Sequence, residues 1–189
     1  MDALLTTFIA AALAELGDKT QLLVIALAAR YRKPRPVIAG VAVAALANNL
    51  IAAAGGTLIS GMITLRAISL LVALALVFAG IAGLARGKKA GDMASTWKTG
   101  PFLTTAICFF LVEFGDKTQF LTAALAAQYD AFGLAAAGAT AGVIAANLPA
   151  AALADRAPAI LMLDRLRIVV AVLFLLVGFV VGLSALRLV

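Results

Sequence analysis

Six long apolar runs, separated by short polar connections, dominate the chain. They cover about residues 3–29, 37–60, 67–85, 101–127, 132–154 and 167–187. A helix needs roughly 20 apolar residues to cross about 30 Å of hydrocarbon, and each run meets this requirement. The connections contain charged and turn-forming residues, such as RYRKPRP after the first run and QYDAFG after the fourth. The pattern therefore predicts an all-α membrane protein with six transmembrane helices.

The composition excludes a soluble globular domain. Hydrophobic residues make up 65% of the 189 positions and charged residues only 13%, which is too little polar surface to cover a soluble fold. The first run has no basic stretch before it and is interrupted by Glu15 and Asp18, so we interpret it as a retained helix and not as a signal peptide. The chain has no histidine, so any metal must be bound mainly by oxygen.

The sequence repeats itself with an offset of 98 residues. AELGDKTQ begins at Ala14, and VEFGDKTQ begins at Val112. The same offset pairs Gly40 with Gly138, Asn49 with Asn147, Leu50 with Leu148, and Gly80 with Gly178. Because a unit of three helices crosses the membrane an odd number of times, its second copy enters from the opposite side. We therefore expect two inverted three-helix repeats, residues 1–86 and 101–189, joined by a basic cytoplasmic linker at 87–100, with the two motifs meeting near the midplane.

Lysine and arginine are concentrated in the connections after the first, third and fifth runs. Eleven of the 15 are found there: Arg30, Arg32, Lys33, Arg35, Arg86, Lys88, Lys89, Lys98, Arg156, Arg165 and Arg167. The opposite side has only Arg66 and Arg187. Since cytoplasmic loops are enriched in these residues, we expect both termini to be extracytoplasmic. The net charge of +6 follows from this topology and does not indicate nucleic-acid binding.

Each motif places two carboxylates and a lysine inside an apolar run. In a continuous helix Glu15, Asp18 and Lys19 would share one face, and the second motif would repeat this arrangement. A carboxylate at the bilayer centre costs about 2.5–3.5 kcal/mol on insertion scales, so something must compensate it. One interpretation is that each glutamate pairs with the lysine one turn later in its own motif. That arrangement would leave the aspartates unpaired.

The combined charge of the two motifs favours a shared cation site. Four carboxylates and two lysines sum to −2, so one divalent cation or two protons would neutralise them. Carboxylate oxygens are hard ligands, typical of Mn²⁺, Ca²⁺ and Mg²⁺. We expect the lysines to pair with carboxylates when no cation is bound. The expected metal ligands are Glu15, Asp18, Glu113 and Asp116, with Lys19 and Lys117 as supporting charges.

Several uncharged residues accompany the carboxylates. Gly17 and Gly115 either loosen the helix, so that carbonyl oxygens face an ion, or allow close helix packing. Asn49 and Asn147 are either metal ligands or interhelical hydrogen-bonding residues. Their equivalence in the repeat favours the ligand role. The weaker supporting candidates are Thr20, Thr118, Gln21 and Gln119.

The duplicated motif resembles the signature of a known family. E-x-G-D-[KR]-[ST], present twice in six helices, is similar to the motif of the Golgi-type calcium/manganese cation:proton exchangers and their bacterial manganese-exporter relatives. Residues 15–20 and 113–118 match every signature position, and the resemblance extends over essentially the whole chain. It implies divalent-cation transport, with the acidic residues of both motifs as the ion site and protons as the counter-ion. Without the targeting sequence and longer central loop of eukaryotic members, the chain resembles a bacterial plasma-membrane member.

Three classes of function are open from the sequence. The first is a secondary transporter that exchanges a divalent cation, Mn²⁺ first and Ca²⁺ second, for protons and exports the metal. The second is an exporter of another small solute, such as an amino acid. The third is an intramembrane enzyme with paired carboxylates, which the lysines disfavour because they hold the acids ionised. The transporter interpretation expects no enzymatic activity, no cofactor, no nucleic acid and no obligate protein partner, only a cation, protons and the lipid bilayer.

Overall fold

The computed structural model describes residues 1–85, 99–152 and 159–187, and every regular element in these ranges is a helix. The predicted all-α class is therefore confirmed for this part of the chain. Most of the predicted basic linker lies outside the described residues, with Arg86, Lys88, Lys89 and Lys98, as does Arg156. The helices are α1 (Asp2–Glu15), α2 (Lys19–Tyr31), α3 (Pro34–Ser60), α4 (Leu65–Leu84), α5 (Pro101–Glu113), α6 (Lys117–Tyr129), α7 (Phe132–Ala152) and α8 (Ala159–Leu186).

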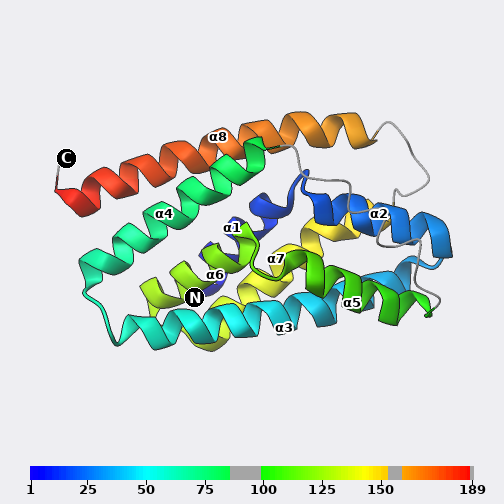
Figure 1. The fold of residues 1–189 in the computed structure, drawn as a ribbon, viewed down its shortest axis with the longest axis horizontal. Coiled ribbons are helices and arrows are strands. Elements are labelled where there is room, and N and C mark those ends of the chain that lie inside the picture. Colours follow the sequence, from blue (N-terminus) through cyan, green and yellow to red (C-terminus); the bar gives the residue numbers. More distant parts are fainter. Residues whose placement is uncertain (86–98, 153–158, 188–189) are drawn as a thin grey trace.

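Four of these helices, α3, α4, α7 and α8, are long and apolar enough to cross a membrane on their own. The first and fourth apolar runs are each divided into two shorter helices, of 14 and 13 residues for α1 and α2 and of 13 residues each for α5 and α6. In Figure 1, α2 follows α1, and α6 follows α5, along the long axis of the bundle. The six-span topology stays a prediction, in which each of these pairs forms one interrupted span.

The offset of 98 residues also relates the helix contacts. α1 packs along α7, and α5 packs along α3. A β-carbon at Gly138 would touch Thr7, and a β-carbon at Gly40 would touch Thr105, which is 98 positions after Thr7. Each contact is thus made twice with the two halves exchanged, which is the pattern that a two-fold relation produces. The opposite orientation of the repeats in a membrane stays a prediction.

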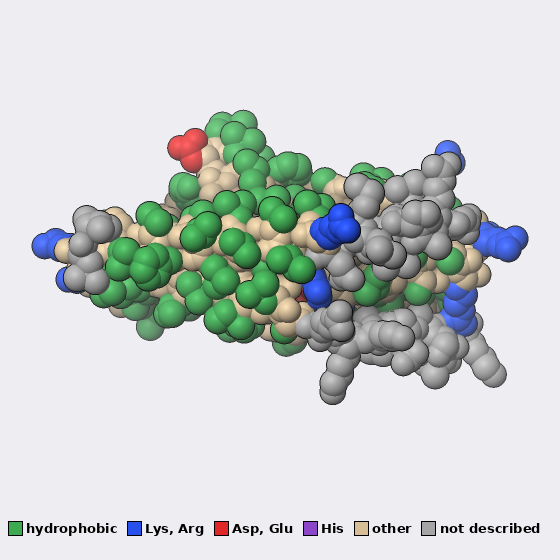
Figure 2. Space-filling model, turned by 90° about the horizontal axis from the view of Figure 1, so that it is seen from above, with side chains coloured by type: hydrophobic (Ala, Val, Ile, Leu, Met, Phe, Trp, Pro, Cys, Tyr) green, Lys and Arg blue, Asp and Glu red, His purple; other side chains and the backbone are tan. Residues whose placement is uncertain are grey.

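The last helices of the two halves, α4 and α8, pack against each other in opposite directions (Figure 1). Arg66 at the start of α4 donates a hydrogen bond to the carbonyl of Ala185 near the end of α8, at 2.8 Å. At the other end, Arg167 of α8 donates to the carbonyl of Ala85 at 3.3 Å. Figure 2 shows hydrophobic side chains over the middle of this surface, with most described Lys and Arg residues toward its two ends. This distribution is typical of a surface in contact with lipid.

A tyrosine at the end of α2 and another at the end of α6 join the two halves at opposite ends of the bundle. The Tyr31 hydroxyl lies 3.0 Å from Oγ1 of Thr104 in α5. The Tyr129 hydroxyl lies 3.1 Å from Oγ1 of Thr6 in α1. These two pairs are related by the same offset of 98 residues. The halves are therefore tied together at both ends by equivalent hydrogen bonds.

Replacement of Gly56 by Ala should destabilise the bundle, whereas the same replacement at its neighbour Gly55 should not. A β-carbon at Gly56 would collide with the backbone of Ala123 in α6, but one at Gly55 would meet nothing within 4 Å in the described part of the chain. Because overpacking costs about 1–3 kcal/mol, we expect Gly56→Ala to lower the midpoint of thermal unfolding in detergent by several degrees. Equal midpoints for the two variants would contradict the close approach of α3 and α6.

Candidate functional site

Both sequence motifs lie at breaks between helices. α1 ends at Glu15 and α2 begins at Lys19, while α5 ends at Glu113 and α6 begins at Lys117. The interpretation of each motif as part of one continuous helix, with Glu15, Asp18 and Lys19 on one face, is therefore wrong. The chain leaves the helical path for three residues in each motif, so side chains from both sides of the break can converge.

A glycine in a left-handed conformation makes each break. Gly17 has φ of +74° and Gly115 has φ of +75°, a region in which a β-carbon is unfavourable. The backbone N–H of Gly17 donates to Oε1 of Gln21 at 2.8 Å, and that of Gly115 donates to Oε1 of Gln119 at 2.7 Å. A β-carbon at Gly115 would meet nothing within 4 Å among the described residues. The backbone conformation, and not close packing, therefore explains this glycine.

The same glutamines tie each motif to the other half of the chain. Nε2 of Gln21 donates to the carbonyl of Ala146 in α7 at 2.6 Å, and Nε2 of Gln119 donates to the carbonyl of Asn48 in α3 at 3.3 Å. Ala146 and Asn48 are equivalent positions of the repeat. Each glutamine thus accepts from its own motif and donates to the opposite half, which fixes the break against the bundle.

The two lysines form ion pairs across the repeats. Nζ of Lys117 lies 2.6 Å from Oδ1 of Asp18, and Nζ of Lys19 lies 3.0 Å from Oδ2 of Asp116. The second contact lacks hydrogen-bond alignment, since Oδ2 of Asp116 has no hydrogen-bond partner among the described residues. It is also more open, because the Lys19 side chain is 29% exposed and that of Lys117 only 3%. The alternative in which each glutamate pairs with the lysine of its own motif is not observed.

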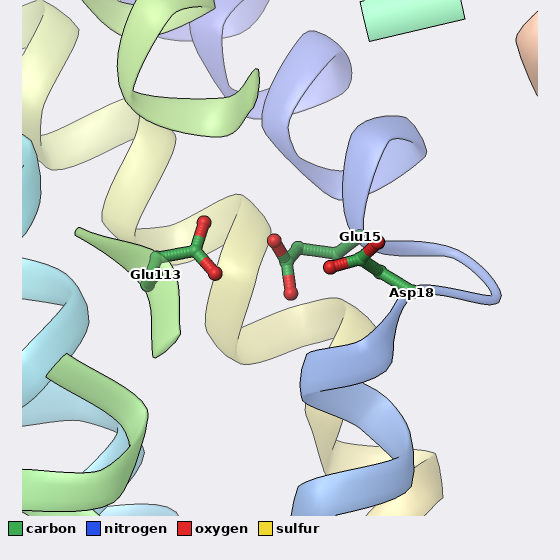
Figure 3. Close-up of side chains that lie close together, drawn as sticks. All are labelled: Glu15, Asp18 and Glu113. Carbon is green, nitrogen blue, oxygen red and sulfur yellow. The ribbon is translucent and has the colours of Figure 1, made fainter. Parts of the chain in front are cut away.

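The two glutamates end α1 and α5 and point toward each other (Figure 3). Glu15 and Glu113 are both buried, with 0% and 2% of their surface exposed. One oxygen from each, together with one from Asp18, lies within 4.8 Å of the others. Asp116 is not part of this close group and instead faces Lys19. Three carboxylates from three helix ends therefore converge in the interior of the bundle.

The hydrogen-bond surroundings of the two glutamates differ. Glu15 accepts hydrogen bonds from Thr20 at 2.6 Å, from Thr118 at 3.0 Å and from Nδ2 of Asn147 at 3.3 Å. Neither carboxylate oxygen of Glu113 has a hydrogen-bond partner among the described residues, and neither does Oδ1 of Asn147. Buried oxygens without partners are unfavourable unless something else compensates them. These three oxygens, beside the carboxylates of Glu15 and Asp18, have the chemistry to bind a hard cation.

Asn49 has different contacts from its repeat equivalent, Asn147. Its Oδ1 accepts a hydrogen bond from Thr122 at 3.1 Å, and its Nδ2 donates to Thr140 at 3.3 Å. These are its hydrogen bonds in the described part of the chain, and none involves a carboxylate. Sequence reasoning did not single out Thr122 and Thr140. Comparison of the repeats could have found them, because the equivalent positions hold Val24 and Ala42.

The structure thus divides the expected ligands into two groups. It brings Glu15, Asp18, Glu113 and Asn147 together, and places Asp116 and Asn49 in neighbouring contacts. Thr20 and Thr118 donate to a carboxylate, and both glycines and both glutamines shape the helix breaks. The binding of a metal by these residues stays a prediction.

Comparison with known proteins agrees with the duplicated motif. The sequence model of the divalent cation/proton antiporter GDT1 matches residues 3–91 and 101–188. The chain belongs to this family. A relative of this GDT1 family member, a candidate manganese exporter of Vibrio cholerae serotype O1, is 42% identical over 130 residues, which are 68% of this chain and 64% of that protein. The match thus spans less than two thirds of the relative's length. No solved structure matches the chain.

Loss of the buried lysine should destabilise this GDT1 family member more than loss of the exposed one. Lys117→Met leaves the largely enclosed Asp18, whose side chain is 13% exposed, without its partner, and breaking a buried ion pair costs about 3–5 kcal/mol. Lys19→Met should cost less, because the Lys19 side chain is 29% exposed. Thermal unfolding of the purified variants in detergent measures the difference.

A second substitution provides the control for this prediction. Asp18→Asn in the Lys117→Met background removes the uncompensated charge and should restore most of the lost thermal stability. Equal decreases in the unfolding midpoint for Lys117→Met and Lys19→Met would contradict the prediction that the more buried ion pair contributes more to stability.

Proposed function

We propose that the chain is a secondary transporter that exchanges a divalent cation for protons and exports the metal. The observation that carries the proposal is the carboxylate of Glu113. It is 2% exposed, has no hydrogen-bond partner among the described residues, and has an oxygen within 4.8 Å of oxygens from Glu15 and Asp18. Membership of a family of divalent cation/proton antiporters supports the class of reaction.

The cation binds at the oxygens of Glu15, Asp18, Glu113 and Asn147. Mn²⁺ is the first choice, because the motif resembles that of manganese exporters and a relative has been named as a candidate manganese exporter. Ca²⁺ is the second choice. Ca²⁺ takes about six to eight oxygen ligands. With one oxygen from each, these four residues offer fewer, so water would complete the coordination shell. The absence of histidine from the sequence disfavours Zn²⁺ and Cu²⁺.

The lysines hold the aspartates while no cation is bound and release them when the cation binds. A protonated lysine has no free lone pair to offer a metal, so Lys19 and Lys117 cannot themselves be ligands. The pair of Lys19 with Asp116 is the more exposed of the two and lacks hydrogen-bond alignment. Asp116 therefore joins the site when Lys19 moves away, and all four motif carboxylates then contribute to one site.

Protons supply the energy for export. Moving a cation outward against an inside-negative potential costs about 2.3 kcal/mol per charge per 100 mV. The chain has no G-x-x-x-x-G-K-[ST] motif to couple transport to ATP. Because the two motifs together carry a net charge of −2, one divalent cation or two protons neutralise them. Exchange in this ratio is electroneutral and is driven by the pH gradient.

The proposed setting is the plasma membrane of a bacterium, with six spans and both termini outside. Family membership and the long apolar helices support a multi-pass membrane protein. The connection between α2 and α3 contains two basic residues, Arg32 and Lys33. It lies at one end of the bundle, and the contact of Arg66 in α4 with α8 lies at the other end (Figure 1). This distribution supports a cytoplasmic position for the α2–α3 connection.

Proteoliposomes that contain a pH-sensitive dye test the exchange directly. Addition of Mn²⁺ should move protons in the opposite direction, and an imposed pH gradient should drive Mn²⁺ flux. A potassium/valinomycin potential should have little effect, because one cation for two protons moves no net charge. Glu15→Gln and Glu113→Gln should each abolish flux while the protein remains inserted. Metal flux without proton movement would contradict the exchange, and strong voltage dependence would contradict the ratio.

Calorimetric titration tests the nature of the substrate. An all-oxygen site should bind Mn²⁺ and Ca²⁺ in preference to Zn²⁺ and Cu⁺, which favour nitrogen and sulfur ligands. The same order should appear in competition for flux into proteoliposomes. Preference for Zn²⁺ or Cu⁺ would overturn the metal assignment. Saturable flux of an amino acid that is indifferent to metals would favour the alternative of a small-solute exporter.

A further inference from the structure

The two halves of the chain differ in the residues that surround their equivalent asparagines. Asn49 of α3 lies between Thr122 of α6 and Thr140 of α7, and hydrogen-bonds to both. The positions equivalent to these two threonines hold Val24 and Ala42, which cannot form hydrogen bonds with a side-chain amide. The sequence therefore supplies two hydroxyl groups around Asn49 that have no counterpart at the equivalent positions of the other half.

The two threonines occupy both ends of the Asn49 amide. Thr122 donates to its Oδ1 at 3.1 Å, and its Nδ2 donates to Thr140 at 3.3 Å. The three residues are buried, with 2%, 2% and 8% of the surface of Asn49, Thr122 and Thr140 exposed. With a hydroxyl at each end and no access to bulk water, the amide is held in one orientation.

Asn147 is oriented differently. Its Nδ2 donates to Oε2 of Glu15 at 3.3 Å and to the carbonyl of Val143 at 2.9 Å. Its Oδ1 is buried and has no hydrogen-bond partner among the described residues. This amide oxygen is therefore available to a cation at the carboxylates, whereas the corresponding oxygen of Asn49 already accepts a hydrogen bond.

The repeat relates Asn49 to Glu113 as it relates Asn147 to Glu15. Since Asn147 reaches Glu15, Asn49 in the equivalent orientation would reach Glu113. Instead, both oxygens of Glu113 lack a hydrogen-bond partner in the described part of the chain. The threonines thus account both for the position of Asn49 and for the absence of an amide beside Glu113.

We propose that Thr122 and Thr140 are positioning residues that hold the amide of Asn49 away from the cation site, so that Asn147 alone contributes an amide oxygen. The proposal rests on the proposed function, in which the carboxylate cluster binds a divalent cation. A transporter must release its substrate as well as bind it. A site with one amide oxygen binds the cation less tightly than a symmetric site with two, and this favours release.

Exchange of the threonines for the residues of the first repeat tests the proposal. Thr122→Val combined with Thr140→Ala frees Asn49 to turn toward Glu113. Residues that orient metal ligands typically change metal affinity by about 10–100-fold, so we expect the Kd for Mn²⁺ to fall by at least about tenfold. Titration of the purified full-length protein with Mn²⁺ alone, followed by the electron paramagnetic resonance signal of free Mn²⁺, gives this Kd. In proteoliposomes the KM should fall together with kcat, because release becomes slower.

The reciprocal exchange should act in the opposite direction. Val24→Thr combined with Ala42→Thr gives Asn147 the hydroxyl partners that Asn49 has, and the Kd for Mn²⁺ should rise by about tenfold or more. If one of the two double variants does not fold, the other decides alone, because each has its own predicted sign. The single variant Thr140→Ala, which removes only the acceptor of the Asn49 amide, should shift the Kd in the same direction as the first pair.

Three controls separate positioning from a general structural effect. Thr122→Ser combined with Thr140→Ser keeps both hydroxyls and should retain the wild-type Kd. Thr57→Val removes a hydroxyl that, among the described residues, bonds only to carbonyls of its own helix, at Ala53 and Ala54, and should not change the Kd. Addition of Asn49→Ala to the Thr122→Val/Thr140→Ala pair should cancel the gain in affinity.

The outcomes also distinguish this inference from the proposed function. If the wild-type protein bound neither Mn²⁺ nor Ca²⁺, the proposed function itself would fail. If the wild type bound Mn²⁺ but the folded double variants did not change the Kd, the positioning role would be overturned. A gain in affinity that persisted after Asn49→Ala would overturn it as well.

Discussion

Polar groups inside a membrane bundle must find their partners within the protein, because hydrocarbon offers none. The broken helices of both motifs create such groups: a freed backbone N–H at each glycine and two carboxylates beside it. Gln21 and Gln119 satisfy the backbone, and Lys19 and Lys117 neutralise the aspartates. Each glutamine comes from its own motif, whereas each aspartate is neutralised by the lysine of the other motif. The carboxylate of Glu113, by contrast, has no hydrogen-bond partner among the described residues.

The compensation works only when both halves are present. Each aspartate is neutralised by the lysine of the other half, and each glutamine donates to a long helix of the other half. Neither half alone would have satisfied charges at its helix break. The arrangement therefore couples the folding of the site to the docking of the repeats, since leaving one partner of a buried ion pair uncompensated costs about 3–5 kcal/mol.

The sequence predicts those features that depend on local pattern and composition. Apolar runs of about 20 residues correctly indicate the long apolar helices α3, α4, α7 and α8, and the offset of 98 residues finds the repeat, the motif and the family. A loosening of the helix at Gly17 and Gly115 was one of two alternatives that the sequence left open, and the left-handed φ of both glycines bears it out. The placement of Glu15, Asp18 and Lys19 on one helix face was wrong, because their spacing fits a helix and does not reveal the break. The crossed ion pairs depend on how the halves dock. The different hydrogen bonds of Asn49 and Asn147 depend on residues distant in sequence, such as Thr122 and Thr140, which a motif does not contain.

The breaks in α1–α2 and α5–α6 also place helix termini next to the carboxylates. Glu15 and Glu113 are the last residues of α1 and α5, while Asp18 and Asp116 immediately precede α2 and α6. A helix carries a partial charge of about −0.5 at its C-terminus and about +0.5 at its N-terminus. The backbone therefore adds negative potential at the two glutamates and positive potential at the two aspartates. The backbone thus gives the glutamates and the aspartates different electrostatic surroundings, a division that acids inside two unbroken helices would not have.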